Sequence, residues 1–158
     1  MAPFFMFAAS TLLGSLAAAA ETWGKNIHWV SLREAQRMSK EEKKPTMVVI
    51  TKTWCRACKA LRPKFASNQD IEKFSSNFIM VNLEDDDEPK SVDFRPDGAY
   101  YPRILFLDVD GVVMENIYNK MGNRQYKYFY SDVEPIVSNM KEVLRQTGGN
   151  KFNKGTEL

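Results

Sequence analysis

The chain has 158 residues, about one domain's worth, and its 44% hydrophobic and 27% charged residues are an ordinary globular composition. The net charge is only +2, so the sequence shows no strong signature of a nucleic-acid or membrane-surface partner. Seven prolines and eight glycines are too few for a disordered or fibrous chain.

The N-terminal segment differs in composition from the rest of the chain. Residues 1–20 contain no charged side chain, and the apolar run from Pro3 to Leu16 ends in four alanines. Small residues at Ala18 and Ala20 fit an A-x-A cleavage site, which predicts a signal peptide over 1–20 and one folded domain over 21–158. The segment lacks the early Lys or Arg of a typical signal, so an uncleaved anchor is the alternative. Its apolar run is shorter than the about 20 residues of a spanning helix, which predicts no membrane span in the mature chain.

The first half of the domain alternates between strand and helix patterns. The apolar run at 47–50 is rich in β-branched residues and is typical of a buried strand. Pro45 ends the preceding helix, and Pro63 is placed to kink the following one. The predicted order is strand 27–30, helix 31–44, strand 47–50, a helix opening at Cys55 and strand 78–83.

The second half is predicted to hold further strands and a final helix. The acidic segment 84–90 is expected to face water, and 91–101 is expected to be a loop. Asp110-Gly111 predicts a hairpin turn, and the spacing of Ser131 and Glu134 predicts a capping box. Gly148-Gly149 should end the last helix. The predicted elements are strand 103–108, an antiparallel return over 112–118, an edge strand at 126–130 and a helix from about 131. Their order predicts an α/β fold, a mixed central sheet with helices on both faces.

The two cysteines of the chain are three positions apart, in Trp54-Cys55-Arg56-Ala57-Cys58-Lys59. The motif follows a buried strand and opens a helix, which is the context that gives a C-x-x-C pair redox chemistry. The spacing lets the sulfurs meet over one helical turn. The helix N-terminus and the positive charges of Arg56 and Lys59 favour a thiolate at Cys55.

Two structural explanations compete with redox chemistry at this pair. A structural zinc site needs four ligands, and beyond its two cysteines the chain offers one histidine, His28, which is expected to be a packed or capping residue. An inert disulfide is the second explanation, but a bridge closing so short a loop removes little chain entropy and does little to stabilise a fold.

The motif and its surroundings resemble the thioredoxin superfamily. The matching features are Trp54-Cys55-x-x-Cys58-Lys59, the kinking Pro63, and Tyr101-Pro102 before an apolar strand, where the family has a cis-proline. The resemblance covers 21–158 and is closer to the small endoplasmic-reticulum branch of thioredoxin domain-containing protein 12 and the anterior-gradient proteins. The segments that carry the resemblance to this branch are 58–65, 80–85, 102–108 and 126–130.

The resemblance implies a thioredoxin fold and a protein-disulfide oxidoreductase with Cys55 and Cys58 as catalytic residues. The substrate-binding residues it implies are Trp54, Arg56, Ala57, Tyr101 and Pro102. A cis-proline places the preceding backbone beside the disulfide, where an extended client segment can pair with it. The alternative at Pro102 is a trans proline that begins a strand.

Two positions depart from the family pattern. Arg56 stands where the branch usually has glycine, which should change thiolate stability and substrate fit. Val49 stands where thioredoxins carry a buried acid, so the base that deprotonates Cys58 is not identified. Lys52 is a candidate for that base, although a solvated lysine is the simpler interpretation.

The resemblance also implies a compartment and partners. Disulfide-bonded client proteins and glutathione are the expected partners, with no metal and no organic cofactor. The C-terminal Gly155-Thr156-Glu157-Leu158 resembles a K-D-E-L retrieval signal, although a chance Glu-Leu ending is the alternative. Together with the N-terminal segment, it predicts the endoplasmic reticulum lumen, a retrieval receptor as partner and partial secretion.

Two other functions compete with disulfide exchange. Some anterior-gradient relatives lack the second cysteine and act through interactions, so a non-catalytic client-binding module is one alternative. The sequence around Asp108 and Asp110 also looks like the nucleophile motif of haloacid-dehalogenase phosphatases. A D-G turn explains those two aspartates without an active site, and too few residues follow to complete one.

Overall fold

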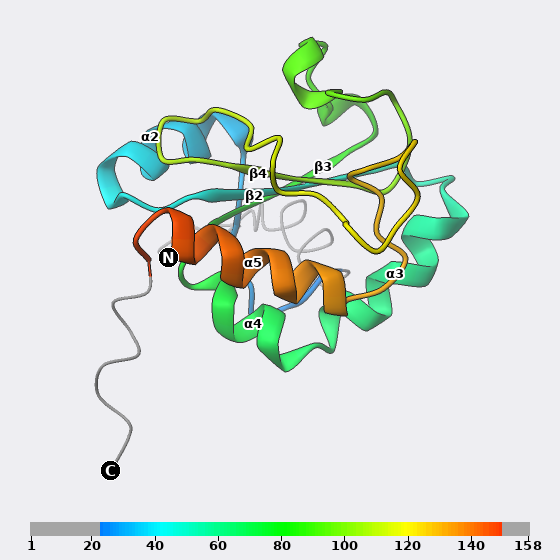
Figure 1. The fold of residues 1–158 in the computed structure, drawn as a ribbon, viewed down its shortest axis with the longest axis horizontal. Helices are drawn as coiled ribbons and strands as arrows, with labels where there is room; N and C mark the ends of the chain where they lie inside the picture. Colours follow the sequence, from blue (N-terminus) through cyan, green and yellow to red (C-terminus); the bar gives the residue numbers. More distant parts are fainter. Residues whose placement is uncertain (1–22, 150–158) are drawn as a thin grey trace, which may run out of the picture.

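The computed structural model describes residues 23–149, so the predicted signal peptide and the C-terminal Gly155–Leu158 signal lie outside the described residues. The described part contains a sheet in the order β1-β3-β2-β4 (Figure 1). β3 is parallel to both neighbours and β4 is antiparallel to β2, which confirms the mixed sheet. The strands are β1 (Trp29–Val30), β2 (Thr46–Thr51), β3 (Ile79–Glu84) and β4 (Arg103–Leu107).

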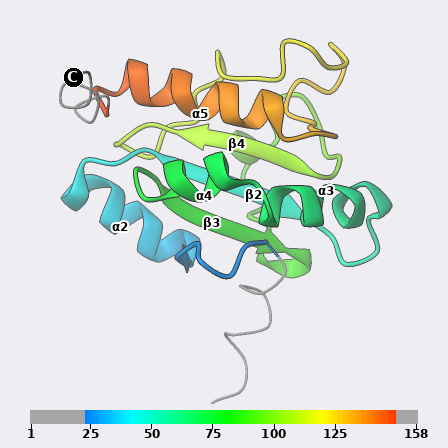
Figure 2. The ribbon, with the colours of Figure 1, turned by 90° about the horizontal axis from the view of Figure 1, so that it is seen from below.

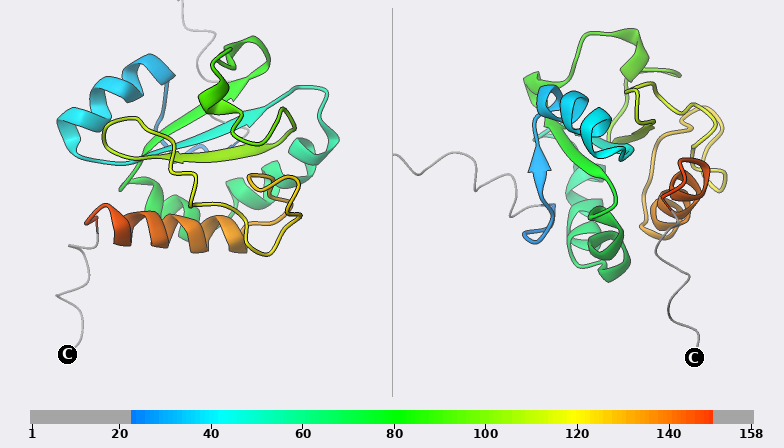
Figure 3. Two further views of the ribbon diagram at one scale, coloured as in Figure 1. Left: turned by 45° about the horizontal axis from the view of Figure 1, so that its top comes forward. Right: turned by 90° about the vertical axis from the view of Figure 1, so that its left-hand side faces the viewer.

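Helices cover both faces of this sheet. Figure 1 shows the sheet nearly edge-on, with α2 above it and α3, α4 and α5 below it. Figure 2 shows α3 and α4 lying across β2 and β3 on the lower face, and both views of Figure 3 agree with this layering. Their bounds are α2 (Leu32–Glu42), α3 (Arg56–Ala66), α4 (Gln69–Ser75) and α5 (Glu134–Gln146), with 3-10 turns η1 (Asp85–Asp87) and η2 (Val92–Phe94).

Each strand contributes side chains to two hydrophobic cores, because successive residues point to opposite faces. All of β2 and β4 is buried, as expected for strands covered on both sides. On the face of α2, Val48, Ile50 and Leu105 pack with Ala35. The opposite core includes both cysteines and the following residues from β2, β4 and the three covering helices: Met47, Val49, Ile104, Leu61, Phe65, Ile71, Ile136 and Met140.

The predicted C-terminal end of the last helix is confirmed and its predicted N-terminal cap is wrong, while α2 has a cap that was not predicted. Ser31 caps α2 with a complete capping box through Glu34. The box predicted at Ser131 is wrong, because α5 begins at Glu134 and Val133 is the N-cap without a side-chain hydrogen bond. The apolar stripe of α5 is buried, and its end is confirmed by Gly148, with φ +74°, and by the bond from Gly149 N to Leu144 O.

The predicted strands at 112–118 and 126–130 are wrong. In the described residues the first segment makes only an isolated bridge between Val113 and Leu107, and the second accepts single backbone bonds from Ile104 N at Tyr128 O and from Asn119 N at Lys127 O. The chain turns after Met114, where Ile117 N donates to Met114 O, and turns again where Asn119 and Asn123 each accept the N–H of the residue two positions ahead. These asparagines were the signal that the sequence prediction passed over.

The Asp110-Gly111 turn is confirmed. Asp108 Oδ1 accepts from the backbone N–H of Asp110 at 2.9 Å and of Val112 at 3.0 Å, and Gly111 has φ +83°. The carboxylate of Asp108 therefore serves the turn, as the alternative to a phosphatase nucleophile required. No helix between residues 23 and 149 combines the length and apolar character needed to cross a bilayer.

Candidate redox-active site

The site is built where β2 ends and α3 begins. After Thr51 the chain turns, and the backbone N–H of Cys55 donates to Lys52 O at 3.1 Å. Cys55 is the N-cap of α3, with extended backbone, and its sulfur accepts the N–H of Cys58 at 3.0 Å. The prediction that Cys55 lies at a helix N-terminus is confirmed. In that position free N–H groups and the helix dipole stabilise negative charge on sulfur.

Cys55 and Cys58 form a disulfide with their Cα atoms 5.2 Å apart. Both are buried, with 5% and 0% exposure, and both belong to the core under the sheet. The two sulfurs are bonded to each other. His28, the candidate third zinc ligand, was predicted to be a packed or capping residue and is exposed. The arrangement can accept two electrons by opening the S–S bond and return them by closing it.

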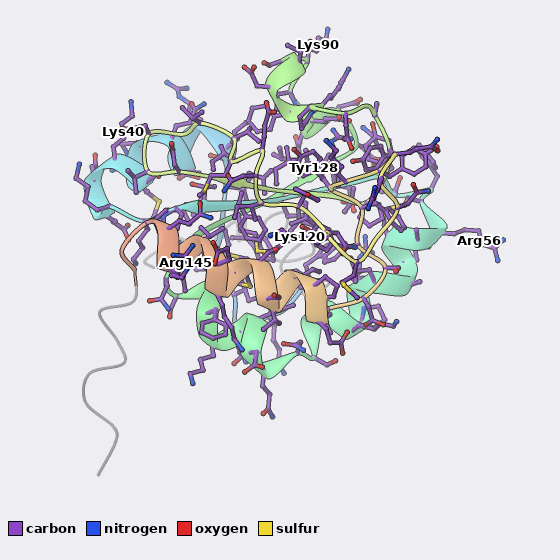
Figure 4. The ribbon with its side chains drawn as sticks, viewed as in Figure 1. Lys40, Arg56, Lys90, Lys120, Tyr128 and Arg145 are labelled. Atoms are coloured by element: carbon purple, nitrogen blue, oxygen red, sulfur yellow. A yellow bond between two sulfur atoms is a disulfide. The ribbon has the colours of Figure 1, made fainter. Side chains whose placement is uncertain are left out.

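Around the buried disulfide, the other predicted site residues differ in exposure. Trp54 is 69% exposed, a large value for a tryptophan. Arg56 is also exposed, and Figure 4 shows it extending away from the protein at the end of the molecule opposite Lys40. Ala57 is half-buried and packs against the core that contains the disulfide. The residues between the cysteines therefore present one long cation to solvent.

Tyr101 and Pro102 reach the same place from the start of β4. Their peptide bond is cis, as the resemblance implied, and Pro102 is buried. The Tyr101 ring meets the Trp54 ring edge-to-face, with centroids 5.9 Å apart. The fold thus brings together Trp54 and Tyr101, which are 47 positions apart in the sequence, beside Cys55.

A buried ion cluster lies behind Tyr101, and the sequence prediction placed one of its members wrongly. The segment 84–90 was expected to face water, but the Glu88 side chain is 3% exposed. Glu88 binds Arg103 at 2.5 Å, Lys52 at 3.0 Å and the Tyr101 hydroxyl at 2.6 Å. Burial raises the pKa of Glu88, but the hydrogen bonds from Tyr101, Lys52 and Arg103 outweigh it and lower the pKa to about 2. Glu88 is therefore ionised at neutral pH.

Arg103 was not selected by the sequence reasoning either. Its side chain is fully buried, and it donates to Phe94 O at 2.8 Å and Tyr100 O at 2.9 Å besides Glu88. A charged residue opening an otherwise apolar strand needs a buried partner of opposite charge. An arginine at the start of an apolar strand, together with the acidic run upstream, could have predicted this buried ion cluster.

The candidates for the base that deprotonates Cys58 gain no support. Val49 is fully buried and apolar, so β2 supplies no acid at that position. Lys52 is paired instead of solvated. Although burial lowers the pKa of Lys52, its bond to Glu88 and the neighbouring Tyr101 raise it overall. An amine with a raised pKa holds its proton more tightly, which disfavours Lys52 as the base.

A mixed sheet of this order, with a disulfide at the N-terminus of the helix after β2, is the thioredoxin fold, and the class is a thioredoxin-fold protein with a Cys-x-x-Cys site. Comparisons with known proteins support this class. The family model described as thioredoxin-like matches residues 28–109. A solved thioredoxin from Thermus thermophilus shares the fold, with a TM-score of 0.56 at 16% identity over 84% of this chain and 99% of its own.

The relatives by sequence are anterior gradient proteins. Anterior gradient protein 3 of Mus musculus is 38% identical over 125 residues, which cover 78% of this chain and 74% of the relative. Anterior gradient protein 2-B of Xenopus laevis is 35% identical, over 77% and 74% of the two chains. The human anterior gradient protein 2 homolog is 34% identical, over 78% and 70%. The chain belongs to the thioredoxin-like family and, within it, to the anterior gradient proteins.

Proposed function

We propose that this protein is a thiol–disulfide oxidoreductase of the endoplasmic reticulum lumen that exchanges disulfides with client proteins through Cys55 and Cys58. The observation that carries the proposal is the disulfide at the N-terminus of α3, where the Cys55 sulfur accepts the Cys58 N–H at 3.0 Å. On reduction the same N–H group can stabilise the Cys55 thiolate. An inert structural bridge has no need of such a position.

Reduction of a client proceeds in two exchanges. The Cys55 thiolate attacks one sulfur of a client disulfide, forming a mixed disulfide and releasing the other client sulfur as a thiolate. Cys58 then loses its proton and attacks the Cys55 sulfur, which releases the second client thiolate and closes the Cys55–Cys58 bond. Two electrons pass from the protein to the client. Oxidation of a client is the reverse. In isomerisation another client thiolate attacks the client sulfur of the mixed disulfide, which forms a new client disulfide and releases the Cys55 thiolate.

The surface beside the disulfide is suited to an extended polypeptide. Trp54 offers an exposed apolar face, Arg56 offers a cation, and the backbone before Pro102 can pair with a client segment. Ala57 is small enough to let the client sulfur approach between the cysteines. These features support a role of Trp54, Arg56, Ala57, Tyr101 and Pro102 in client binding.

Compartment and redox partner belong to the same proposal. The signal-like residues 1–20 and the retrieval-like Gly155–Leu158 support the endoplasmic reticulum, with a retrieval receptor binding the C-terminus and some protein escaping to the medium. Glutathione is the redox buffer proposed to return the Cys55–Cys58 pair to its starting redox state, and no bound metal or organic cofactor is required. Removing 155–158 should increase the secreted fraction.

Trapping tests the exchange directly. Cys58→Ser leaves Cys55 without its resolving partner, so mixed disulfides with clients should accumulate and disappear on reduction. Cys55→Ser, which keeps one cysteine of the pair, should trap far fewer. If the double variant Cys55→Ser/Cys58→Ser retains the same partners through non-covalent contacts, the client-binding module is the correct function instead.

A further inference from the structure

The acidic segment that follows β3 is bonded to the turn that presents Cys55. The backbone N–H of Thr53 donates to Asp85 Oδ1 at 2.9 Å, and Lys52 Nζ donates to Asp85 O at 2.7 Å. Asp85 adopts φ +53°, a conformation that is uncommon for a residue other than glycine and that directs both acceptors to this turn. The turn from Thr51 to Cys55 is thus held from outside its own helix and strand.

Glu88, which is buried, also binds the turn that presents Cys55, through its ion pair with Lys52. Its carboxylate faces three cations, Lys52, Arg95 and Arg103, at 3.0, 3.3 and 2.5 Å. Such a buried carboxylate is retained only with close partners, because stripping water from it is costly. Glu88 therefore has a fixed place, and the groups bonded to it are fixed as well.

Tyr101 connects the buried Glu88 to the surface proposed to bind the client. Its hydroxyl donates to Glu88 Oε2 at 2.6 Å, and Lys52 Nζ lies 4.9 Å from its ring centroid. Its ring edge meets Trp54, which is 69% exposed. One end of Tyr101 is thus held in the core, while its ring sets the orientation of an aromatic surface beside the disulfide.

We infer that Glu88 is a positioning residue for client binding, which acts by holding the Tyr101 hydroxyl so that the Tyr101 and Trp54 rings are preorganised for a polypeptide. This rests on the proposed function, since it concerns the client surface of the same exchange. Glu88 does not touch the reacting sulfurs. Its effect should therefore be on the KM for a polypeptide disulfide and not on exchange with a small disulfide that needs no such surface.

Three variants separate positioning from stability. Tyr101→Phe loses the hydroxyl but leaves Glu88 ion-paired. Glu88→Gln loses the charge but keeps an oxygen that can accept the Tyr101 hydroxyl. Glu88→Ala loses both. Matched controls are Tyr126→Phe, at a partly exposed tyrosine, and Asp87→Asn, at an exposed acid one position before Glu88.

The assay compares a synthetic peptide closed by one disulfide with hydroxyethyl disulfide, with reduced glutathione as the reductant that regenerates the dithiol, at a temperature where circular dichroism shows each variant folded. Tyr101→Phe and Glu88→Ala should raise the KM for the peptide about tenfold with kcat and hydroxyethyl disulfide rates near wild type, the lower end of the scale for one lost hydrogen bond to a charged group. Glu88→Gln and both controls should keep the wild-type KM, although Glu88→Gln lowers the melting temperature.

The outcomes against the inference are distinct. If Tyr101→Phe keeps the wild-type KM, or if Glu88→Gln raises it as much as Glu88→Ala in step with lost stability, Glu88 has only a structural role. If Glu88→Ala does not fold, Tyr101→Phe and Glu88→Gln still decide. A wild-type protein that turns over neither disulfide overturns the proposed function itself, and the inference with it.

Discussion

The backbone N–H of Cys58 points at the sulfur of Cys55 across 3.0 Å, inside the disulfide-bonded first turn of α3. The donor belongs to the backbone, so it stays in place when the S–S bond opens. It then stabilises the Cys55 thiolate, together with the free N–H groups of the helix end. The two cysteines should therefore differ in chemistry, with Cys55 expected to be the better nucleophile.

This asymmetry gives a prediction about alkylation. In a Cys58→Ser protein, iodoacetamide should modify Cys55 at half its maximal rate at a pH below the value of about 8.5 for an ordinary cysteine. Arg56→Glu should move that pH upward by about one unit, because the cation that follows Cys55 in the sequence is replaced by an anion. Lys40→Glu, at the opposite end of the molecule, is the charge-reversal control and should leave it unchanged. An equal shift in both variants would contradict a local effect of Arg56.

The Glu88 cluster predicts a specific acid sensitivity. The pKa of Glu88 is lowered from 4.5 to about 2, so its ion pairs stabilise the folded state above pH 4.5 and are lost as the pH falls toward 2. The contribution is on the order of 3 kcal/mol. Urea unfolding of the wild type and of Glu88→Gln should therefore differ most at neutral pH and converge on acidification. A difference that does not depend on pH would place the stabilisation elsewhere.

Arg103 and Glu88 should be strongly coupled. Arg103→Met leaves a buried carboxylate short of its closest cation and should cost about 3 kcal/mol or more in free energy of unfolding. Replacing both residues with methionine should cost less than the sum of the single changes, by at least about 1 kcal/mol. Strict additivity in urea titrations with unchanged m-values would show that the pair does not interact as its 2.5 Å separation indicates.

The disulfide should contribute little to the fold. It joins cysteines three positions apart, so it restricts the unfolded chain by only about 2 kcal/mol. The double variant Cys55→Ser/Cys58→Ser should keep its circular dichroism spectrum and melt about 6 °C lower. Loss of folding in that variant would instead make the bridge structural, as in the inert-disulfide interpretation.

Elements that have a local sequence pattern were predicted correctly. The runs around Val48 and Ile104 and the stripe of α5 carry their own periodicity, so these elements were predicted within a few residues. The C-x-x-C pair at a helix start is a short-range pattern and was located correctly. The family resemblance supplied the cis bond at Pro102, which no local pattern would have shown.

The failures share a dependence on distant contacts. Glu88 belongs to an acidic run that suggests solvent, and its burial is favourable because partners distant in the sequence, chiefly Arg103 and Lys52, bind its carboxylate. The segment 112–118 has strand-like composition, but pairing stops after Val113 because the chain turns at Glu115 and Asn116, where Ile117 N donates to Met114 O. Side-chain partners of this kind are decided by the assembled fold and not by local preference.

The reduction potential of Cys55–Cys58 in the mature protein, titrated in glutathione buffers and read by thiol labelling, tests the central claim most directly. Disulfide exchange in the endoplasmic reticulum predicts a two-electron transition between about −180 mV, typical of oxidases and isomerases, and about −270 mV, typical of reductases. The position within that range would also give the net direction of exchange. A pair that stays fully oxidised or fully reduced across the whole range would contradict redox exchange with glutathione and leave client binding as the function.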